Sequence, residues 1–189
     1  MKIGLNIGSG QRKFNTVPED MAWVNVDCVS RPPDQVPDLI CNVGMEPLPY
    51  DGGIIDMVVL HQVLEHMHLG PEMDQLLGEC YRVIKPEGSL IITVPDMRAL
   101  AARWLTGQIE DYIFMVNVYG AWQGYGGDDH HWGFSASSLH QLLETGQKWS
   151  KVHAFNWRPI AGADIARDWW ILGMECVKRR LSIGKQLSL

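Results

Sequence analysis

Short apolar runs, each ended by a glycine, an acid or an amide, constrain the fold of this chain more than any other feature. Runs of this length with such boundaries predict buried β-strands. Five of them lie in the first half of the chain, at Ile3–Ile7, Trp23–Val26, Asp38–Val43, Ile54–Leu60 and Ser89–Val94. The first half is therefore predicted to supply most strands of one sheet.

The segment between the fourth and fifth runs predicts that this sheet is parallel. Pro71–Lys85 carries its apolar residues on one helical face, Pro71 suits the first turn, and Pro86 ends the helix. Fully apolar strands joined by a crossover helix are typical of a parallel sheet covered on both faces. The predicted class is α/β, with a Rossmann-like, doubly wound and mostly parallel sheet.

The last third of the chain predicts a second helix and two closing strands. Ser135 suits the N-cap of this helix, three leucines form its apolar face, and Gly146 ends it. The closing strands are expected at Lys151–Trp157 and Trp170–Val177. They would complete the sheet.

The chain of 189 residues has a length that normally forms one domain. Residues 96–134 are rich in Gly, Tyr, Trp and His and are expected to form an irregular insertion that binds substrate or acts as a lid. We expect one domain over residues 1–177 and a basic tail over residues 178–189.

Charge and composition limit the partners. The formal net charge of −6 gives no support for binding nucleic acid or anionic lipid. Four scattered cysteines without Cys-x-x-Cys spacing, and a strand pattern that follows Met1-Lys2 without a signal-peptide pattern, predict a cytoplasmic protein. No apolar run approaches the roughly 20 residues that span a bilayer. We expect a small-molecule or saccharide partner, and homodimer formation stays open.

Two glycines one residue apart, Gly8 and Gly10, follow the first predicted strand. Ligands of open parallel sheets bind beyond the carboxyl ends of the strands, where glycine lets them approach the backbone. A dinucleotide fingerprint is incomplete, because Lys13 stands at the third glycine position and Pro18 follows. Asp27, at the end of the second strand, is placed to bind ribose hydroxyls. These residues fit any adenosine-containing ligand, or a simple turn.

The motifs taken together resemble the class I S-adenosylmethionine-dependent methyltransferases, type 11 branch. The similar segments are LNIGSG, WVNVD, DLICNVGMEPLPYDGGIIDMVVLHQVLEH and ECYRVIKPEGSLIITVPD. The later NVYGAWQGYGGDDHHWGF and SLHQLLETG are similar to small methyltransferases often found with surface-polysaccharide genes. The resemblance covers residues 1–160 and implies the class I methyltransferase fold, with S-adenosylmethionine as cofactor.

The resemblance also implies a set of cofactor-binding residues around the strand ends. They are Asn6, Gly8, Ser9 and Gly10 at the first strand, Asp27 and Cys28 at the second, Asn42 and Val43 at the third, and His61 and Gln62 at the fourth. The glycine turn would line the methionine and ribose, Asn42 would meet the adenine amino group, Val43 would lie against the ring, and His61 would border the transferred methyl.

Four residues depart from the family pattern. Asn6 and Asn42 stand where acids are usual, Ile55 replaces Phe, and Glu87 replaces Gly. The two amides remove charge next to the cofactor, yet an amide oxygen still accepts a hydrogen bond. We interpret them as tuning the affinity.

Methyl transfer to a hydroxyl group needs a base, and histidines supply the candidates His130, His131 and His61. We favour His130, because an adjacent carboxylate could orient it and raise its basicity. Each of these histidines could instead serve only as a hydrogen-bonding group. Four histidines, at 66, 68, 130 and 131, make a metal site conceivable, but no ligand spacing supports one, and we predict none.

The leading hypothesis is transfer of a methyl group from S-adenosylmethionine to an oxygen or nitrogen of a small molecule or saccharide. A non-catalytic binding or partner subunit with the same fold is the alternative, supported by Asn6 and Asn42. A nicotinamide-dependent oxidoreductase is disfavoured by Lys13 and Pro18. The absence of an Asp/Asn-Pro-Pro-Tyr/Phe motif disfavours a DNA methyltransferase.

Overall fold

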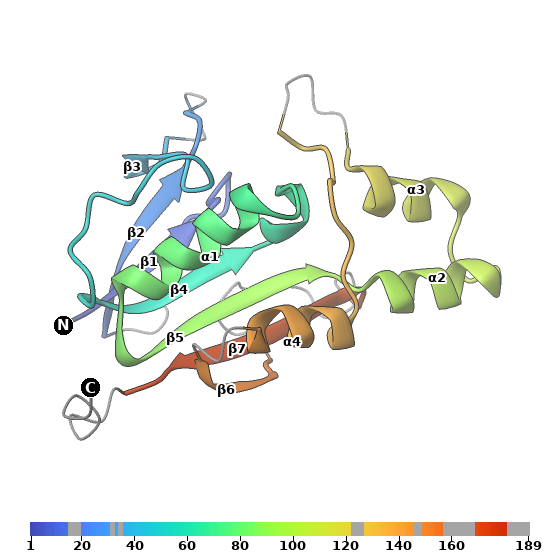
Figure 1. The fold of residues 1–189 in the computed structure, drawn as a ribbon. Coiled ribbons are helices and arrows are strands. Elements are labelled where there is room, and N and C mark those ends of the chain that lie inside the picture. Colours follow the sequence, from blue (N-terminus) through green and yellow to red (C-terminus); the bar gives the residue numbers. More distant parts are fainter. Residues whose placement is uncertain are drawn as a thin grey trace.

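One mixed sheet of seven strands organises the chain (Figure 1). The computed structural model describes residues 1–14, 20–30, 33, 36–121, 127–145, 149–156 and 169–180. The strands are β1 (Lys2–Ile7), β2 (Met21–Asp27), β3 (Leu39–Ile40), β4 (Ile55–His61), β5 (Ile84–Pro95), β6 (Trp149–Ala154) and β7 (Ile171–Lys178). The helices are the 3-10 turn η1 (Leu64–His66) and α1 (Pro71–Val83), α2 (Met97–Leu105), α3 (Asp111–Tyr119) and α4 (Ala136–Glu144).

The strand order is β3-β2-β1-β4-β5-β7-β6. Strands β1 to β5 run parallel, and β7 pairs antiparallel with both β5 and β6. The mostly parallel α/β sheet predicted from the sequence is therefore confirmed. Chain order reverses between β1 and β4, so the switch point at which open α/β sheets bind ligands lies between the ends of these two strands.

The predicted elements are found with shifted ends. β3 is shorter than predicted, because the Asn42 carbonyl accepts hydrogen bonds from the amides of Met45 and Glu46 and turns the chain away. α1 ends before Lys85, since Ile84 already has extended backbone angles and starts β5. Ser135 caps α4 as predicted, through a bond from the Ser138 amide.

The prediction that residues 96–134 are irregular is wrong in part, because this segment contains α2 and α3. Asp96 caps α2 by accepting bonds from two amides of the first turn. α3 is apolar along most of its length and has no buried residue. Helices without a one-sided apolar stripe give no periodic signal in the sequence. The domain boundaries stay a prediction, since residues 181–189 lie outside the described residues.

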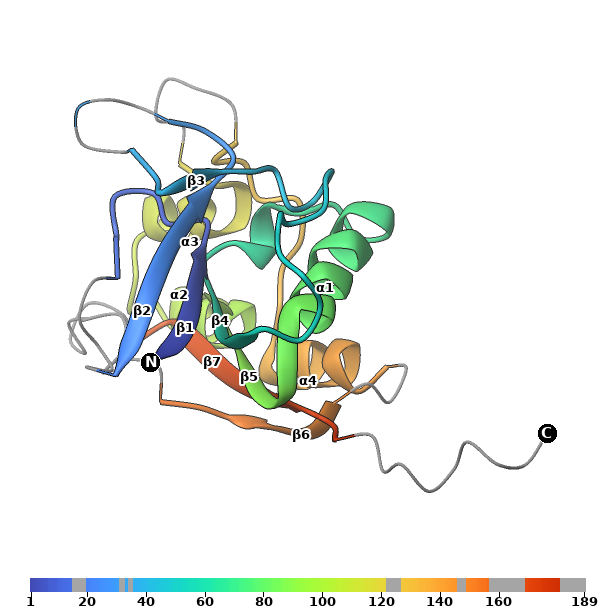
Figure 2. The same ribbon diagram turned by 90° about the vertical axis from the view of Figure 1, so that its left-hand side faces the viewer.

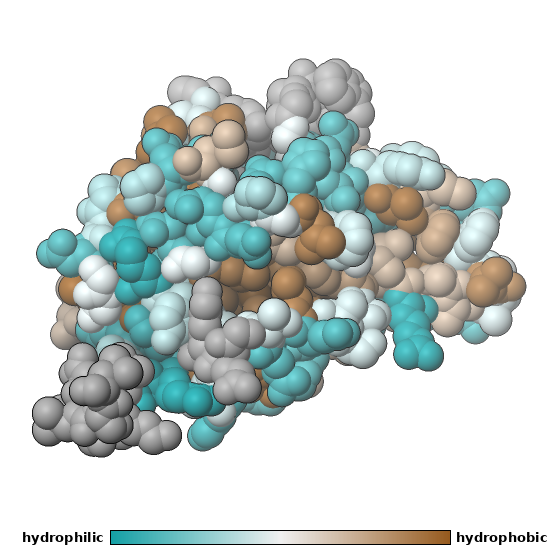
Figure 3. All heavy atoms as spheres, viewed as in Figure 1, coloured by the Kyte–Doolittle hydropathy of each residue, from teal (hydrophilic) through white to brown (hydrophobic). Residues whose placement is uncertain are grey.

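The main core lies between the sheet and the helices α1 and α4, which both pack on one face (Figures 1 and 2). Leu5, Val58 and Leu90 contribute from the strands, and Leu76 and Leu139 from the helices. Apolar side chains are visible between α1 and α4 in Figure 3.

A smaller cluster on the opposite face consists of Phe14, Val59, Ile91 and Ile171, with Trp23 packed against it. The sequence predicted helices on both faces of the sheet. Within the described residues, α1 and α4 cover one face. No helix in this part of the chain is long and apolar enough to cross a membrane.

Candidate functional site

The carboxyl ends of β1, β2, β3 and β4 bring most of the predicted cofactor residues to one edge of the sheet. This arrangement follows from parallel pairing, because parallel strands end on the same side. The glycine turn after β1 lies beside Asp27 of β2 and close to the β4 end. The edge is therefore the candidate cofactor site.

Hydrogen bonds attach the glycine turn to the end of β2. The amides of Gly8 and Ser9 donate to the Val26 carbonyl at 2.8 and 3.0 Å, and the Gly10 amide donates to the Asp27 carboxylate at 2.8 Å. Gly8 (φ +71°) and Gly10 (φ +49°) both have left-handed backbone. A Cβ at Gly8 would collide with Val63, whereas one at Gly10 would meet open space. Gly8 thus allows close packing, and Gly10 leaves room for a ligand.

Asp27 holds this turn and keeps acceptor capacity. One of its carboxylate oxygens accepts from Gly10 and the other accepts from the Val29 amide at 3.2 Å. An ionised carboxylate has about four lone-pair sites, so two such bonds leave capacity for ribose hydroxyls. Cys28 beside it is exposed.

Two buried polar atoms at this edge have no hydrogen-bond partner within the described residues. They are the hydroxyl oxygen of Ser9 and the amide nitrogen of Gln62. Gln62 also has left-handed backbone, with φ +57°. Buried polar groups without partners are rare and destabilising, and strained backbone gathers at functional sites. Both side chains fit a site completed by a polar ligand.

The side chain of Asn6 stabilises the loop after the glycine turn. Its amide is buried and donates to the Arg12 carbonyl at 2.8 Å and to the Asn25 side chain at 3.0 Å. The Asn25 oxygen also accepts from the Phe14 amide. Asn6 therefore fixes the loop that follows the glycine turn, with bonds that a carboxylate could not donate.

The two residues after β3 face different surroundings. Asn42 is exposed, and its backbone amide is bonded to Glu46. Val43 is only 3% exposed and belongs to the main core. Asn42 therefore keeps its side chain available for an adenine ring, while Val43 packs inward.

His61 is buried with both ring nitrogens engaged. The Arg12 guanidinium lies 2.9 Å from its Nε2, and the Thr93 hydroxyl lies 2.7 Å from its Nδ1. Because arginine only donates, Nε2 accepts, and Nδ1 carries the proton and donates to Thr93. Burial, with the Arg12 charge as the smaller cause, lowers the pKa of His61 to about 4. His61 is therefore neutral near pH 7.

The buried state of His61 predicts a pH-dependent stability. The unfolded chain binds the His61 proton with a pKa near 6.5, and the folded protein binds it only near 4. Stability from this group is complete above pH 6.5 and is lost as the pH falls towards 4, by up to about 3 kcal/mol. Urea unfolding between pH 4.5 and 8 should show this loss in the wild type and a smaller one in His61→Gln. Parallel curves would contradict it.

Four of the other histidines form two separate pairs. His66 and His130 meet edge to face, with ring centroids 4.8 Å apart, whereas His68 and His131 stack at 3.9 Å. His131 is exposed and lies with His68 outside the first pair. Of the three predicted catalytic histidines, the structure therefore places His61, His130 and His131 in three different surroundings.

The sequence suggested that an adjacent carboxylate orients His130. In the structure a backbone carbonyl does so instead. Its Nδ1 lies 2.8 Å from the Asn117 carbonyl, and burial lowers its pKa. The Nδ1 of His66 lies 3.1 Å from the Asp129 carbonyl. Carbonyl oxygens only accept, so both rings carry their proton on Nδ1 and present a lone pair on Nε2.

Glu65 lies next to this pair and was not predicted as a site residue. It is 1% exposed, and neither carboxylate oxygen has a partner within the described residues. Burial raises the pKa of Glu65 to about 8. The available signal in the sequence is an acid between Leu64 and His66, directly after a buried strand.

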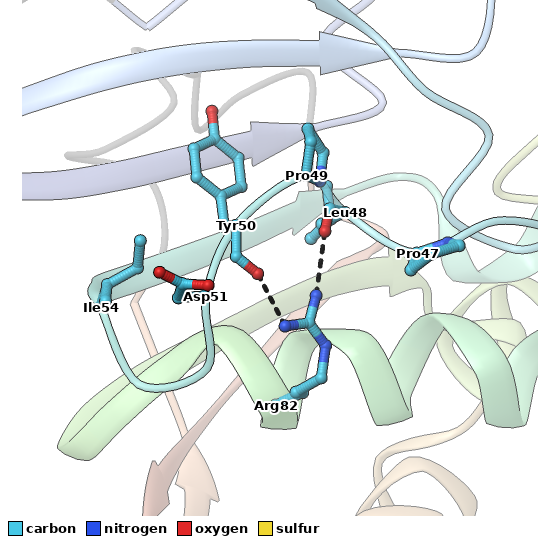
Figure 4. Close-up of a pocket in the computed structure, with 7 residues that line it drawn as sticks. All are labelled: Pro47, Leu48, Pro49, Tyr50, Asp51, Ile54 and Arg82. Carbon is cyan, nitrogen blue, oxygen red and sulfur yellow. Dashed lines mark hydrogen bonds between the residues drawn. The ribbon is translucent and has the colours of Figure 1, made fainter.

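A shallow hollow lies away from this edge (Figure 4). It is lined by Pro47, Leu48, Pro49, Tyr50, Asp51, Ile54 and Arg82, just before the start of β4. Arg82 points from α1 to the carbonyls of Leu48 and Tyr50 at 2.9 and 2.7 Å, and it pairs with Glu79. Its charge is already satisfied, so we assign this hollow a structural role.

Replacing Arg82 tests that role. Arg82→Ala would leave two carbonyls without this donor, and Glu79, whose side chain is 10% exposed, with only the Leu48 amide as a donor. Because the Arg82 side chain itself is 38% exposed, we expect a loss of about 2 kcal/mol, or about 4–8 °C in Tm, by thermal unfolding. The exposed Arg98→Ala on α2 is the control, and equal effects would refute the assignment.

Part of the chain matches a known protein family. Residues 12–92 match a family model described as a methyltransferase domain. The matched part includes Asp27, Asn42 and His61 and begins just after the glycine turn. The search of curated proteins gives no match.

Solved methyltransferases share the fold. The 1,6-didemethyltoxoflavin-N1-methyltransferase of Burkholderia thailandensis, bound to S-adenosylhomocysteine, has 15% identity and a TM-score of 0.56, over 94% of this chain and 71% of its own. The plantazolicin methyltransferase BpumL with SAH has 14% identity and a TM-score of 0.60, over 95% and 77%. The CurJ carbon methyltransferase has 12% identity and a TM-score of 0.57, over 95% of this chain and 49% of its own.

The fold is therefore that of the class I methyltransferases. Together with the match of residues 12–92 to a methyltransferase-domain model, this fold agrees with the resemblance seen in the sequence.

Proposed function

We propose that this chain transfers a methyl group from S-adenosylmethionine to an oxygen or nitrogen atom of a small molecule or saccharide. The observation that carries the proposal is the meeting of Gly10, Asp27 and two buried polar atoms without a described partner, the Ser9 hydroxyl oxygen and the Gln62 amide nitrogen, at the switch point of the sheet. S-adenosylmethionine, when bound, supplies a methyl group activated on a sulfonium.

Each residue at the site would bind the part of the cofactor that lies closest to it. Asp27 accepts from the ribose hydroxyls, and Gly10 leaves space for the ribose to approach. Asn42 reaches the adenine amino group from the exposed end of β3. Ser9 and Gln62 offer hydrogen bonds to the methionine part, and His61 borders it as a neutral ring.

Of the three predicted catalytic histidines, His130 suits the role of base best. Its Nε2 carries a lone pair while the Asn117 carbonyl fixes the ring. His61 would have to release Arg12 before it could take a proton, and His131 stacks on His68 instead. A base in this position would remove the proton of an acceptor hydroxyl.

Exposed aromatic side chains on α3 and on the segment that contacts η1 favour an acceptor with a ring or an apolar face. Trp132 is 44% exposed, and Tyr112 and Tyr119 of α3 are 71% and 67% exposed. Aromatic rings of this kind bind planar rings and the faces of sugars. Phe134, in the same segment as Trp132, is 2% exposed and lies in the core. Trp122 and Tyr125 lie outside the described residues.

The bond between Arg12 and His61 favours the second candidate, a non-catalytic methyltransferase-fold subunit. The guanidinium lies at the ring that would border the methyl group. A binding protein could keep this bond permanently, whereas an enzyme must move Arg12 aside or use it.

Turnover with a panel of acceptors distinguishes an enzyme from a non-catalytic subunit. The purified protein is incubated with S-adenosylmethionine and phenols, amines or saccharides, and S-adenosylhomocysteine is quantified by mass spectrometry. An enzyme should give acceptor-dependent product with at least one class, and His130→Gln should lower the rate by about 100-fold or more. Binding of the cofactor without product from any class would favour the non-catalytic subunit.

A further inference from the structure

Glu65, His66 and His130 form a cluster of which the methyl-transfer proposal uses only His130. One ligand-type atom from each residue lies within 4.8 Å of the other two. Glu65 and His66 come from η1, and His130 comes from the segment that passes η1 and leads into α4 (Figure 1). The amides of His131 and Trp132 both donate to the Glu65 carbonyl, at 2.8 and 3.1 Å, and hold the two segments together.

We propose that Glu65, His66 and His130 bind a divalent transition-metal ion. The first argument is the state of Glu65, which is 1% exposed with neither carboxylate oxygen bonded within the described residues. A buried carboxyl group without any hydrogen bond is costly in either protonation state. A cation between Glu65 and the two imidazoles removes that cost.

The second argument is the orientation of the rings. Each Nδ1 bonds to a backbone carbonyl, that of Asp129 for His66 and that of Asn117 for His130. Metal-binding histidines commonly donate their second N–H to a carbonyl or carboxylate, which fixes the ring and its tautomer. In both rings the lone pair that a metal needs is therefore on Nε2, and no described residue bonds to it.

The third argument is distance. Two imidazoles that bind one ion at about 2.1 Å, with 90–110° between them, place their ring centroids about 4.6–5.3 Å apart. The observed separation of 4.8 Å between His66 and His130 falls in this range. His68 and His131 do not fit, because their rings stack face to face at 3.9 Å and the His68 Nδ1 is already bonded to Glu72.

Two imidazoles and one carboxylate select the kind of ion. This set suits zinc, iron(II) and similar ions, whereas magnesium and calcium prefer oxygen ligands. Three protein ligands leave coordination positions open, as in catalytic sites. An ion held here would take the Nε2 lone pair of His130, so the ion rather than His130 would make a bound acceptor hydroxyl more acidic.

Metal binding can be measured without any knowledge of the acceptor. The protein is stripped with a chelator, dialysed and titrated with Zn²⁺ by calorimetry, and Co²⁺ is added to follow its visible absorption. We expect one ion per chain in the wild type and in His68→Gln, a neighbouring exposed histidine. Glu65→Gln and His130→Gln should weaken binding by about 100-fold or more.

The outcome is independent of cofactor binding, so its failure and the failure of the methyl-transfer proposal are distinguishable. A folded wild type that takes up no Zn²⁺ would overturn the metal site, and so would unchanged binding in both Glu65→Gln and His130→Gln. If Glu65→Gln does not fold, His66→Gln replaces it. If Mg²⁺ binds as tightly as Zn²⁺, the assignment to imidazole ligands is wrong.

Discussion

Asp27→Ala should weaken the binding of S-adenosylhomocysteine by about 100-fold, measured by calorimetry. The carboxylate is expected to accept two charge-assisted hydrogen bonds from the ribose, each worth about 1.5 kcal/mol or more. It also accepts from the Gly10 amide at 2.8 Å and so shapes the glycine turn. Its loss removes a ligand contact and a support of the site together.

Two further variants make this result specific. Asp20→Ala removes an exposed acid at the other end of β2, where it pairs with Lys2, and should leave binding unchanged. Asp27→Asn keeps an oxygen for Gly10 and should bind more tightly than Asp27→Ala. Equal affinity in wild type and Asp27→Ala would show that the ribose does not bind here.

Gly8→Ala should destabilise the fold by about 3 kcal/mol, measured by urea unfolding. A methyl group at this position collides with Val63, and the backbone angle φ of +71° disfavours any side chain. Overpacking costs about 1–3 kcal/mol, and left-handed backbone adds about 1 kcal/mol or more. The turn must shift, so cofactor binding should fall as well.

Gly10→Ala is the matched control for Gly8. It has φ +49° but open space around its Cβ, so about 1 kcal/mol of destabilisation is expected. In Gly8→Ala/Val63→Ala the collision is relieved, and the double variant should lose less stability than the two single effects added together. Equal destabilisation by Gly8→Ala and Gly10→Ala would contradict the packing role of Gly8.

The strands and the site edge can be predicted because both depend on local patterns. An apolar run that ends at Gly8, Asp27 or His61 marks a buried strand and its carboxyl end at once. Parallel pairing then gathers these ends without further information. For this reason the sequence predicts where Gly10 and Asp27 meet.

The contacts around the histidines depend on segments that are distant in the sequence. His130 is bonded to Asn117 rather than to a neighbouring acid, and Glu65 approaches His130 only through the fold. The α3 helix, apolar on all sides, carries no pattern that distinguishes it from a loop or a strand. Spacing along the chain therefore could not predict the Glu65–His66–His130 cluster.

Asn6 shows how a departure from a family pattern is explained by structure. In the family pattern an acid is usual at this position, so the sequence alone indicates that a negative charge beside the cofactor is missing. In the fold its amide donates to Arg12 and Asn25, which an acid at this position could not do. The substitution therefore serves the loop after the glycine turn.

The most direct test of the central claim is a calorimetric titration of the wild-type protein with S-adenosylhomocysteine, with NAD as the comparison. We expect one site with a dissociation constant on the order of micromolar for S-adenosylhomocysteine and no measurable binding of NAD. A folded protein that binds neither ligand, or that binds NAD more tightly, would contradict the assignment of this edge as a methyl-donor site.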